Sequence, residues 1–355
     1  MSFLILVINP GSTSTKIALY NDEKQEWSTT LRHSIEELKR YPDSFSQLDW
    51  RLSMILATLS GYGTDLHSLA AVIGRGGLLK PVPGGVYEVD DNMVDDLRTA
   101  SMQHPANLGA PLALAIARMA GVKAFIADPP IMDEMSDVAH VTGIREIRRR
   151  SVFHALNHRA VARRYAHMVN RSYEELNLII VHLGGGISVA AHQKGRVTDV
   201  NNAYDGDGPI APERAGTIPA GQLADLCFSG KYTHEEVKRL CCGRGGIVDL
   251  MGTNAMEDVR ARAAGGDREA ALMVDAVCYT VAKSVGAMAA VLKGEVDAIL
   301  LTGGMAHSKL MTDKIADRCR FIASIEIFPG EDEMGALAEN AMRVLRSECE
   351  VKQYA

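Results

Sequence analysis

The sequence lacks several features that mark common classes of protein. Its six cysteines form no Cys-x-x-Cys pair, and all lie in the second half of the 355-residue chain. Neither a disulfide framework nor a zinc pattern is predicted, and reduced thiols in the cytoplasm fit this usage best. Basic residues are not in excess, since 38 Lys and Arg stand against 44 Asp and Glu, a net charge of −6. This balance argues against a general nucleic-acid-binding protein, which needs a basic surface.

Long uncharged apolar runs are also missing. Residues 3–8 are apolar, but no basic segment precedes them and Asn-Pro-Gly follows, so we interpret them as a buried strand rather than a signal peptide. The longest apolar helical stretch, near residues 270–292, contains Asp275 and Lys283. A membrane span needs about 20 residues with few or no charges, so this stretch is predicted to be a core helix. No membrane partner is expected.

Two widespread nucleotide motifs are absent, although glycine-rich turns are present. Residues 11–16, Gly-Ser-Thr-Ser-Thr-Lys, combine glycine, hydroxyls and a final lysine, but not in the order of a Walker loop. Gly184, Gly185 and Gly186 do not begin a dinucleotide fingerprint, because the sixth position is Val189 and a strand follows. An NAD enzyme is therefore disfavoured. Such turns let backbone N–H groups approach phosphate, and a hydroxyl-rich hairpin is the alternative for residues 11–16.

An internal repeat is the main positive feature. Residues 4–7 and 178–181 are matching apolar strands, and Gly11 falls on Gly185 at the same separation of 174 residues. This repeat predicts a duplicated α/β domain. We place the first domain at residues 1–165 and the second at 166–335, with a C-terminal helix in 336–355 that packs on the first. Further expected elements are helices over 47–60, 92–120 and 151–169, a strand over 124–127, and a strand leading to glycine over 298–304.

Four motifs, in family order from residue 9 to about 340, resemble the acetate and butyrate kinase family. Residues 9–16 resemble its Asn-x-Gly-Ser-Ser-Ser-x-Lys signature, and 153–158, Phe-His-Ala-Leu-Asn-His, resemble Phe-His-Gly-Thr-Ser-His. Residues 182–188, His-Leu-Gly-Gly-Gly-Ile-Ser, resemble His-Leu-Gly-Asn-Gly-x-Ser, and 302–304 resemble its Thr-Gly-Gly turn. The chain length and residues 205–216 look like the butyrate branch. Residues 101–107 depart from the family's Leu-His-Asn-Pro-Ala-Asn pattern, because Gln103 stands in the histidine slot and His104 follows it.

The resemblance implies a fold and a reaction. The fold is two duplicated actin-like (ribonuclease H-like) domains around a nucleotide-binding cleft. The reaction is reversible transfer of the ATP γ-phosphoryl group to butyrate or a related short-chain fatty acid, giving an acyl phosphate and ADP. ATP/ADP and Mg²⁺ are the implied cofactors, and a homo-oligomer, dimer or larger, is implied. A carboxylate is already an anionic nucleophile at pH 7, so the reaction needs cations to offset charge rather than a strong base.

Four residues are expected in the chemistry: Arg75, Asp128, His154 and Arg214. Arg75 follows an apolar strand and is flanked by glycines, so its guanidinium suits a carboxylate or phosphate, whereas a surface arginine is the alternative. Arg214 matches the family arginine that stabilises the transferring phosphoryl group, with an ion pair to Glu213 or Asp207 as its alternative. Asp128 ends a strand, where it suits Mg²⁺ or its waters or else caps a turn. His154 is assigned by the resemblance to the phosphoryl group in transfer.

Nucleotide and metal contacts complete the expected site. The expected nucleotide-binding residues lie in the glycine-rich turns and at their flanking strands: Asn9, Gly11, Ser12, Lys16, His182, Gly184, Gly185, Gly186, Gly303 and Gly304. Asn9 and Glu333 resemble the family's pair near the metal, with Glu331 and Asp332 as competitors for Glu333. The spacing of His154 and His158 would also suit a helix face with ordinary hydrogen bonds, while zinc is disfavoured because Ala155 stands where a zincin has Glu. The basic run Arg145, Arg148, Arg149 and Arg150 is read as a solvated or subunit-contact face.

Rival functions follow from the same residues. An acetate or propionate kinase would share the mechanism and differ in pocket size. An actin-like, nucleotide-switched assembly protein would use the same turns without needing Arg75 or Arg214.

Overall fold

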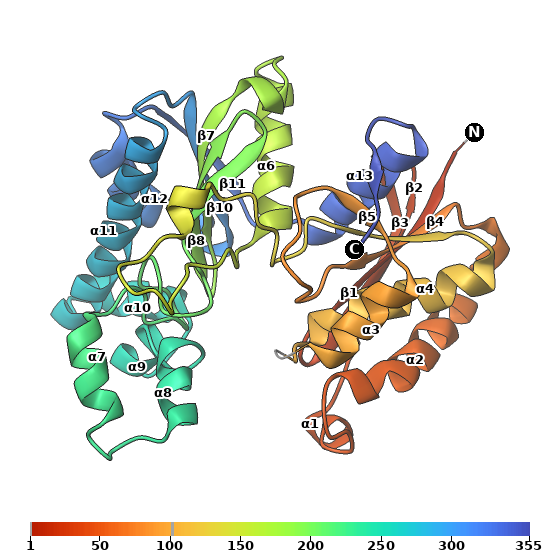
Figure 1. Ribbon diagram of the computed structural model, residues 1–355, viewed down its shortest axis with the longest axis horizontal. Helices are drawn as coiled ribbons and strands as arrows, with labels where there is room; N and C mark the ends of the chain where they lie inside the picture. Colours follow the sequence, from red (N-terminus) through yellow and green to blue (C-terminus); the bar gives the residue numbers. More distant parts are fainter. Residues whose placement is uncertain (1, 101–102) are drawn as a thin grey trace. The chain divides into compact units, whose positions relative to one another are not determined.

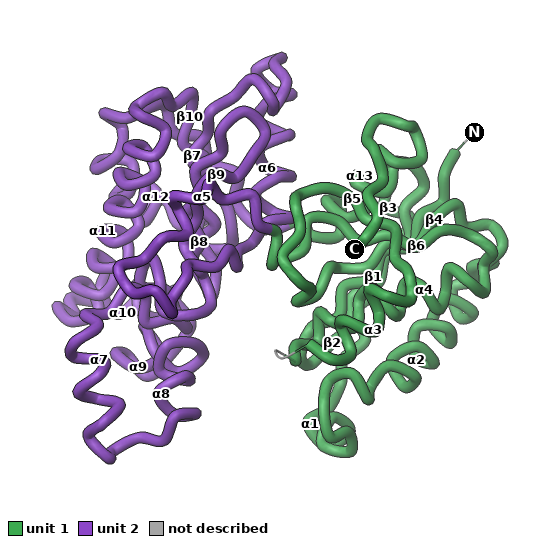
Figure 2. The backbone as a smooth tube through the Cα atoms, in the orientation of Figure 1, with its two compact units in different colours: residues 1–132, 332–355 green, residues 133–331 purple. Residues whose placement is uncertain are grey.

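A computed structural model describes residues 2–100 and 103–355. The chain forms two compact units, which Figure 2 colours separately. Unit 1 comprises residues 1–132 and 332–355, and unit 2 comprises residues 133–331. Unit 2 is therefore an insertion between two parts of unit 1. Both ends of the chain belong to unit 1 (Figure 1).

Unit 1 is built on a mixed sheet with the strand order β12-β5-β6-β4-β1-β2-β3. Its strands are β1 (Leu4–Pro10), β2 (Ser14–Asn21), β3 (Lys24–Arg32), β4 (Ala71–Arg75), β5 (Val86–Glu88), β6 (Lys123–Ala127) and β12 (Val351–Lys352). Its helices are α1 (Ile35–Leu38), η1 (Phe45–Gln47), α2 (Leu48–Gly61), η2 (Leu66–Ser68), α3 (Asp91–Thr99), η3 (Pro105–Leu108), α4 (Gly109–Ala120) and α13 (Glu333–Leu345). In β1, Leu6 and Ile8 join the core formed with α2 and α4. Ile5 and Val7 point to the opposite sheet face, because side chains alternate along a strand.

Unit 2 has the sheet order β11-β10-β7-β8-β9. Its strands are β7 (Asn177–Leu183), β8 (Ile187–Gln193), β9 (Arg196–Val200), β10 (Ala298–Gly303) and β11 (Ser324–Pro329). Its helices are α5 (Asp137–His140), α6 (Ala155–Met168), η4 (Tyr173–Glu175), α7 (Ala220–Cys227), α8 (His234–Cys241), α9 (Ile247–Met251), α10 (Met256–Ala264), α11 (Arg268–Val291), η5 (Gly304–His307) and α12 (Lys309–Cys319). Ile179 and Val181 of β7 pack with α10, α11 and α12, whereas Leu178 and Ile180 pack with α6. The sheet is thus covered by helices on both faces.

The two units repeat one strand topology. In unit 1 the order β3-β2-β1-β4-β6 has two antiparallel pairs followed by two parallel pairs. In unit 2 the order β9-β8-β7-β10-β11 has the same directions in the same places. The internal match of β1 with β7 therefore marks a duplicated α/β fold, and this prediction is confirmed.

The structure divides the chain elsewhere than the sequence predicts. The expected boundary follows residue 165, but residues 133–165 group with unit 2. The reason is the apolar face of α6, where Val161, Ala162 and Tyr165 pack against β7 and β10. At the other end, residues 332–355 return to unit 1, where α13 contacts β1 and β4 and β12 pairs with β5.

Two helical predictions differ in detail. The region expected as one helix over 92–120 contains α3 and α4 as separate helices, and η3 begins at Pro105 between them. Proline ends helices because it lacks an N–H and restricts the residue before it. α11 is long and apolar enough to cross a membrane by length and composition. In unit 2 it contacts α10, α12 and β8, and Val274, Val277 and Val281 on its inner face are buried in the core.

Candidate functional site

In unit 1, the turn between β1 and β2 is held by a buried arginine from α2. Arg51 Nη1 donates to the Gly11 carbonyl at 2.9 Å and to Thr15 Oγ1 at 3.0 Å, and Nη2 lies 3.4 Å from the Ser12 carbonyl. Gln47 Oε1 accepts from Arg51 Nε and Nη2 at 3.0 and 2.8 Å. The carbonyl side of the turn is thereby fixed, while Ser12 is exposed.

Arg51 is fully buried, and its bonded oxygens belong to carbonyl, hydroxyl and amide groups. Desolvation lowers the pKa of Arg51 to about 10, so it stays charged at neutral pH. His33, 2.9 Å from Thr15 Oγ1, has its pKa lowered to about 4 by burial and then by the charge of Arg51. Sequence motifs missed Arg51. Its signal is a basic residue on the same buried helix stripe as Ile55 and Leu59.

Asn9, Arg75 and Glu333 lie together at one edge of the unit 1 sheet. Asn9 and Arg75 each follow the last registered pair of the parallel strands β1 and β4, Ile8 with Gly74, so they lie side by side at the end of the ladder. Arg75 pairs with both Glu333 oxygens, at 2.9 Å to Oε1 and 3.0 Å to Oε2. Asn9 Nδ2 donates to Glu333 Oε2 at 2.7 Å. Lys16, which is exposed, is the cross-strand neighbour of Asn9.

The three acidic candidates near residue 333 occupy different places. Glu331 Oε1 is 3.7 Å from His182 Nε2 in unit 2. Asp332 caps α13, where Oδ1 accepts from the Gly335 N–H at 2.9 Å. Of the three, Glu333 is the residue beside Asn9.

Asp128 follows β6 and is buried. Its Oδ1 accepts from the Gly85 N–H at 2.9 Å, and its own N–H donates to the Gly85 carbonyl at 3.0 Å. Its φ of 40° is in the left-handed region, which is costly for a residue with a side chain. Asp128 therefore holds the segment around Gly85 through two hydrogen bonds while its own backbone is strained.

Gln103 and His104, in the segment that departs from the family's histidine motif, bind nearby backbone groups. His104 Nδ1 accepts from the Ala106 N–H at 3.1 Å at the start of η3. Gln103 Nε2 donates to the carbonyls of Arg98 and Ala100. The first two residues of this motif, 101 and 102, lie outside the described residues.

In unit 2, the turn after β7 gathers the predicted side chains around three glycines. Gly184 N–H donates to the Gly186 carbonyl at 3.1 Å. A Cβ on Gly184 would lie 2.7 Å from His182 Nε2, so only glycine leaves room for this buried ring. A Cβ on Gly186 would lie 3.7 Å from both His154 Cε1 and Arg214 Nε. His154, His182 and Arg214 therefore meet at this turn.

The two histidines are stacked. The rings of His154 and His182 have centroids 3.7 Å apart and an interplanar angle of 11°. His182 Nδ1 contacts Asn157 Oδ1 at 2.9 Å. Within residues 2–100 and 103–355, no group of three His, Cys, Asp or Glu side chains is arranged to hold a metal ion.

Behind His154 lies a row of buried polar side chains that sequence reasoning missed. Ser188 Oγ is 2.9 Å from His154 Nδ1 and 2.8 Å from His158 Nε2. His158 Nδ1 is 3.2 Å from His192 Nε2, and His192 Nδ1 is 2.7 Å from the Tyr173 hydroxyl. The available signal is polar residues at alternate positions in otherwise apolar strands, which places Ser188 and His192 on one face of β8.

Arg214 is folded against its own loop. Its Nε donates to the Ala203 carbonyl at 3.2 Å, and its guanidinium lies 5.7 Å from the centre of the Tyr204 ring. Its Nη1 is 3.5 Å from Glu213 Oε2, so the ion pair considered from sequence is present. Glu213 also accepts from Asn254 Nδ2 at 2.7 Å.

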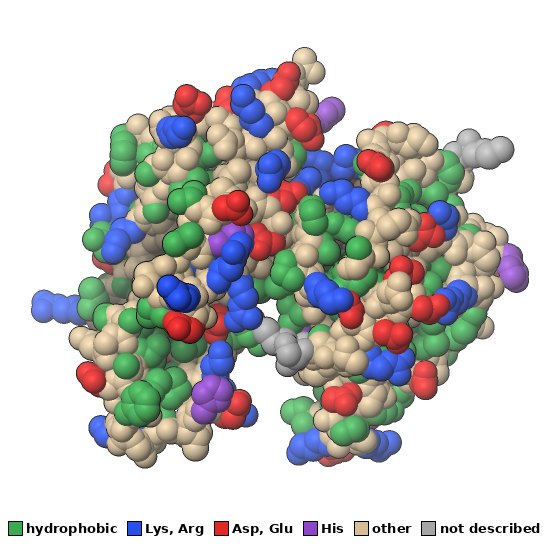
Figure 3. All heavy atoms as spheres, viewed as in Figure 1, with side chains coloured by type: hydrophobic (Ala, Val, Ile, Leu, Met, Phe, Trp, Pro, Cys, Tyr) green, Lys and Arg blue, Asp and Glu red, His purple; other side chains and the backbone are tan. Residues whose placement is uncertain are grey.

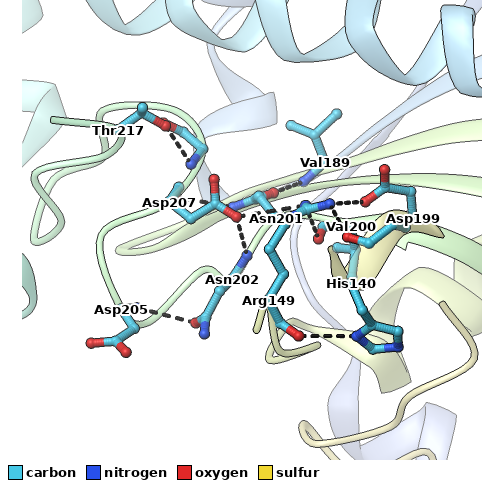
Figure 4. Close-up of polar contacts among 12 residues, drawn as sticks. His140, Arg149, Val189, Asp199, Val200, Asn201, Asn202, Asp205, Asp207 and Thr217 are labelled. Atoms are coloured by element: carbon cyan, nitrogen blue, oxygen red, sulfur yellow. Dashed lines mark hydrogen bonds and ion pairs between the residues drawn. The ribbon is translucent and has the colours of Figure 1, made fainter. Parts of the chain in front are cut away.

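The loop that carries Arg214 is anchored by Arg149 (Figure 4). Arg149 Nη1 donates to Asp199 Oδ1 at 2.9 Å, and Nη2 donates to the Val200 carbonyl at 2.9 Å and lies 3.6 Å from Asp207 Oδ2. Asp207 Oδ2 in turn accepts from the Asn202 N–H at 3.1 Å. The expectation of a solvated basic run fits the exposed Arg145, Arg148 and Arg150, but it is wrong for Arg149, because buried acceptors on β9 bind it.

Gly303 and Gly304 end β10. Gly303 has a φ of 89°, and a Cβ there would lie 2.5 Å from the Leu183 carbonyl oxygen. Gly304 begins η5, and a Cβ there would have nothing within 4 Å. The first glycine is thus required by backbone packing, and the second borders open space.

On the face shown in Figure 3, Lys and Arg side chains are interspersed with Asp and Glu over both units.

Asn9 and Glu333 offer oxygen atoms, which are the ligands that suit Mg²⁺. Mg²⁺ prefers oxygen ligands and is usually held by one or two carboxylates, waters and substrate phosphates. Asn9 supplies an amide oxygen and Glu333 a carboxylate. Both Glu333 oxygens are engaged by Arg75, so the carboxylate is shared between the guanidinium and any metal.

Comparisons with known proteins agree on one family. Residues 137–327 match the acetokinase family. The chain is 51% identical over 355 residues to butyrate kinase 2 of Clostridium acetobutylicum, and the match covers all of both chains. The crystal structure of Porphyromonas gingivalis acetate kinase matches 97% of this chain and 100% of its own, with a TM-score of 0.79 and 20% identity. A propionate kinase from Francisella tularensis matches 95% of this chain and 98% of its own, with a TM-score of 0.77 and 18% identity. These structures confirm the predicted actin-like fold.

Proposed function

We propose that this chain, which belongs to the acetokinase family of carboxylate kinases, transfers the γ-phosphoryl group of ATP reversibly to butyrate. The observation that carries the choice of butyrate is the 51% identity to butyrate kinase 2 over the full length of both chains. The products are butyryl phosphate and ADP.

The chemistry follows from the charges of the reactants. A butyrate oxygen attacks the γ-phosphorus, a new P–O bond forms, and the bond to the ADP oxygen breaks. The carboxylate is ionised at neutral pH, so no group has to remove a proton from it. The protein must instead hold two anions and stabilise the charge on the phosphoryl oxygens.

In this proposal, unit 1 supplies the residues that bind the butyrate carboxylate and the metal ion. Arg75 gives one N–H of each Nη to Glu333 and binds the butyrate carboxylate through its remaining N–H groups. Gly11, Ser12 and Lys16 bind nucleotide phosphate, supported by the fixed turn. Asp128 borders this group at the end of β6, the strand beside β4.

In this proposal, unit 2 supplies the residues that bind the phosphoryl group. His154 and Arg214, which meet at Gly186, bind the phosphoryl group in transfer, and His182 binds a phosphate oxygen. Gly184, Gly185 and Gly186 let the phosphates approach the backbone. Gly303 and Gly304 contact the adenosine, where Gly304 offers open space.

Mg²⁺ would be held by Asn9 and Glu333, with substrate phosphates and waters as its other ligands. When bound, it offsets charge on the phosphate oxygens. Because Glu333 also pairs with Arg75, Glu333 links the carboxylate-binding group to the metal-binding group.

The remaining properties are proposed from the sequence. The cysteine usage and the net charge of −6 suit a cytoplasmic enzyme without a nucleic-acid partner. Its partners are the short-chain acid and the adenine nucleotide, and the family resemblance suggests a homo-oligomer.

A hydroxamate assay tests the function directly. Purified protein is incubated with ATP, Mg²⁺ and straight-chain acids of two to six carbons, and acyl phosphate is trapped with hydroxylamine. We expect the highest kcat/KM with the four-carbon acid. A maximum at two or three carbons would reassign the chain as an acetate or propionate kinase, and no product with any acid would reject a carboxylate kinase in favour of a nucleotide-switched assembly protein.

A further inference from the structure

A continuous row of hydrogen-bonding groups runs from His154 into the interior of unit 2. Its links are His154 Nδ1 to Ser188 Oγ (2.9 Å), Ser188 Oγ to His158 Nε2 (2.8 Å), His158 Nδ1 to His192 Nε2 (3.2 Å) and His192 Nδ1 to the Tyr173 hydroxyl (2.7 Å). Ser188, His158 and His192 are fully buried, and Tyr173 is 4% exposed. Each imidazole uses one nitrogen toward each neighbour, so the rings connect the links in series.

This row arises from two periodicities. His154 and His158 are one helical turn apart at the start of α6, and Ser188 and His192 lie on the same face of β8 because they are four residues apart in a strand. Leu178 and Ile180 place α6 on that face of the sheet. The helix and the strand therefore present alternating partners to each other.

The inner rings carry one hydrogen each. Burial, and then the neighbouring His192, lower the pKa of His158 well below its ordinary value. Burial and the charge of Arg159 lower the pKa of His192 to about 3. A neutral imidazole is a donor at one nitrogen and an acceptor at the other, so the direction of one link fixes the direction of the next.

Two features of the inner end set that direction. A phenol hydroxyl is a good donor to an imidazole nitrogen, which places the Tyr173 hydrogen on the link to His192. The Arg159 guanidinium lies 5.7 Å from the centre of the Tyr173 ring, and its positive charge favours hydrogens that point away from this end. His192 then donates to His158, and His158 donates to Ser188.

We propose that Tyr173, His192, His158 and Ser188 are positioning residues that fix the tautomer of His154. Ser188 donates to His154 Nδ1, and His154 keeps its hydrogen on Nε2. This inference rests on the proposed function for its use: a His154 that presents its Nε2–H as a donor can bind a phosphoryl oxygen, whereas the other tautomer would present a lone pair to an anion. The stacked His182 ring holds the plane of His154, while the row holds its hydrogen.

Nitrogen NMR of histidine-labelled full-length protein tests the tautomer without reference to activity. His154→Gln identifies the His154 signals by their loss. In the wild type we expect a pyridine-type shift at His154 Nδ1 and a pyrrole-type shift at Nε2. Ser188→Ala removes the donor to Nδ1, and Tyr173→Phe removes the hydrogen at the far end, so both should raise the Nδ1–H population of His154.

Tyr165→Phe is the matched control, because Tyr165 is buried in the same apolar cluster as Tyr173 and is not a member of the row. We expect it to leave the His154 shifts unchanged. A pyrrole-type His154 Nδ1 in the wild type would overturn the proposal, as would unchanged His154 shifts in both Ser188→Ala and Tyr173→Phe.

Kinetics distinguish this inference from the function on which it rests. Partners that orient a functional histidine typically contribute about 10- to 100-fold to activity. We expect Ser188→Ala and Tyr173→Phe to lower kcat about tenfold with little change in the KM for ATP, and Tyr165→Phe to retain kcat. Wild-type protein that phosphorylates no acid would remove the proposed function, and the NMR shifts would still decide the order of the hydrogens. Shifted His154 tautomers with an unchanged kcat would overturn the role in the reaction.

Discussion

The two units hold equivalent turns by opposite means. In unit 1, the turn after β1 is held by one buried cation, Arg51, which binds its carbonyl groups. In unit 2, the turn after β7 is bordered by buried, hydrogen-bonded side chains such as His182 and Asn157. The strand topology is the same, so the duplicated fold provides the place of each turn and the local side chains provide its chemistry.

The difference lies in what each turn presents. Unit 1 keeps the charge of Arg51 behind the turn and exposes Ser12 and Lys16. Unit 2 places His154, His182 and Arg214 directly at the glycines. We infer that unit 1 uses its turn to hold a ligand and unit 2 uses its turn to act on one.

Removing Arg214, the half-buried cation at the turn of unit 2, should have the largest effect on catalysis. Arg214→Ala should lower kcat by about 1,000-fold or more with modest change in ATP affinity, because a cation aimed at the transferring phosphoryl group acts mainly in the transition state. Steady-state kinetics and ATP binding measure the two effects separately. Arg320→Ala, an exposed and ion-paired arginine of the same unit, is the control. A kcat near the wild-type value would remove Arg214 from the mechanism.

Removing the hidden cation of unit 1 should change stability instead. Arg51→Met leaves the carbonyls of Gly11 and Ser12 without their donor, which should cost about 3 kcal/mol. Both tryptophans, Trp27 and Trp50, lie in unit 1, so tryptophan fluorescence during urea unfolding reports on that unit.

The control for Arg51 is Arg118→Met in the same unit. Arg118 is exposed and ion-paired to Asp91, so its loss should change the free energy of unfolding by less than about 1 kcal/mol. Equal effects of the two substitutions would contradict the special role of Arg51.

The two units should differ in acid stability because they contain different numbers of buried histidines with lowered pKa. The folded-state pKa of His33 is about 4, below its ordinary value, so the unfolded chain takes up its proton first as the pH falls from about 6.5 to 4. The stability of unit 1 should therefore fall by up to about 3 kcal/mol in this range. Unit 2 carries two such residues, His158 and His192, and should lose more.

Hydrogen exchange of β8 amides and tryptophan fluorescence measure the two units in one pH series. We expect unit 2 to open at a higher pH than unit 1, and His33→Gln to flatten the acid response of unit 1 alone. Loss of both units at the same pH, unaffected by His33→Gln, would show that other groups control acid stability.

The smallest expected effect compares one glycine from each turn. Gly184→Ala would place a Cβ 2.7 Å from His182 Nε2 and should lower kcat about tenfold by displacing that buried ring. Gly11→Ala meets Ser14 O only at 3.5 Å, so it should leave the turn in place and change kcat less than about twofold, while the KM for ATP reports its effect on nucleotide binding. If Gly11→Ala proved the more harmful substitution, the turn of unit 1 would be the tighter one.

The fold could be predicted because it depends on patterns that the chain repeats. The match of β1 with β7 and the glycine after each strand were sufficient for a duplicated α/β fold. The domain boundary was not predictable in the same way, because it depends on which sheet receives the apolar face of α6. Pro105 marked a break within the region expected as one helix, yet the spacing of apolar residues alone gave a single element.

The grouping of the candidate site residues was predictable where motifs place them at or near strand ends. Asn9 and Arg75 fall at or near the ends of adjacent parallel strands, and His154, His182 and Arg214 meet at one glycine turn. The roles of Arg51 and Arg149 in holding the two loops were not predictable, because an arginine within a helix or a basic run is expected at the surface. Only the packed structure shows that their acceptors are buried backbone and side-chain oxygens.

The insertion of unit 2 within unit 1 sets an order of assembly on the ribosome. The strands of unit 2 are all contained in residues 133–331, so this unit can complete its sheet as soon as that segment emerges. Unit 1 begins before unit 2 but is completed after it, because α13 and β12 follow residue 331. Until then, Arg75 lacks Glu333 and one sheet face of unit 1 lacks its covering helix. The ion pair between Arg75 and Glu333 therefore forms only after unit 2 has been synthesised.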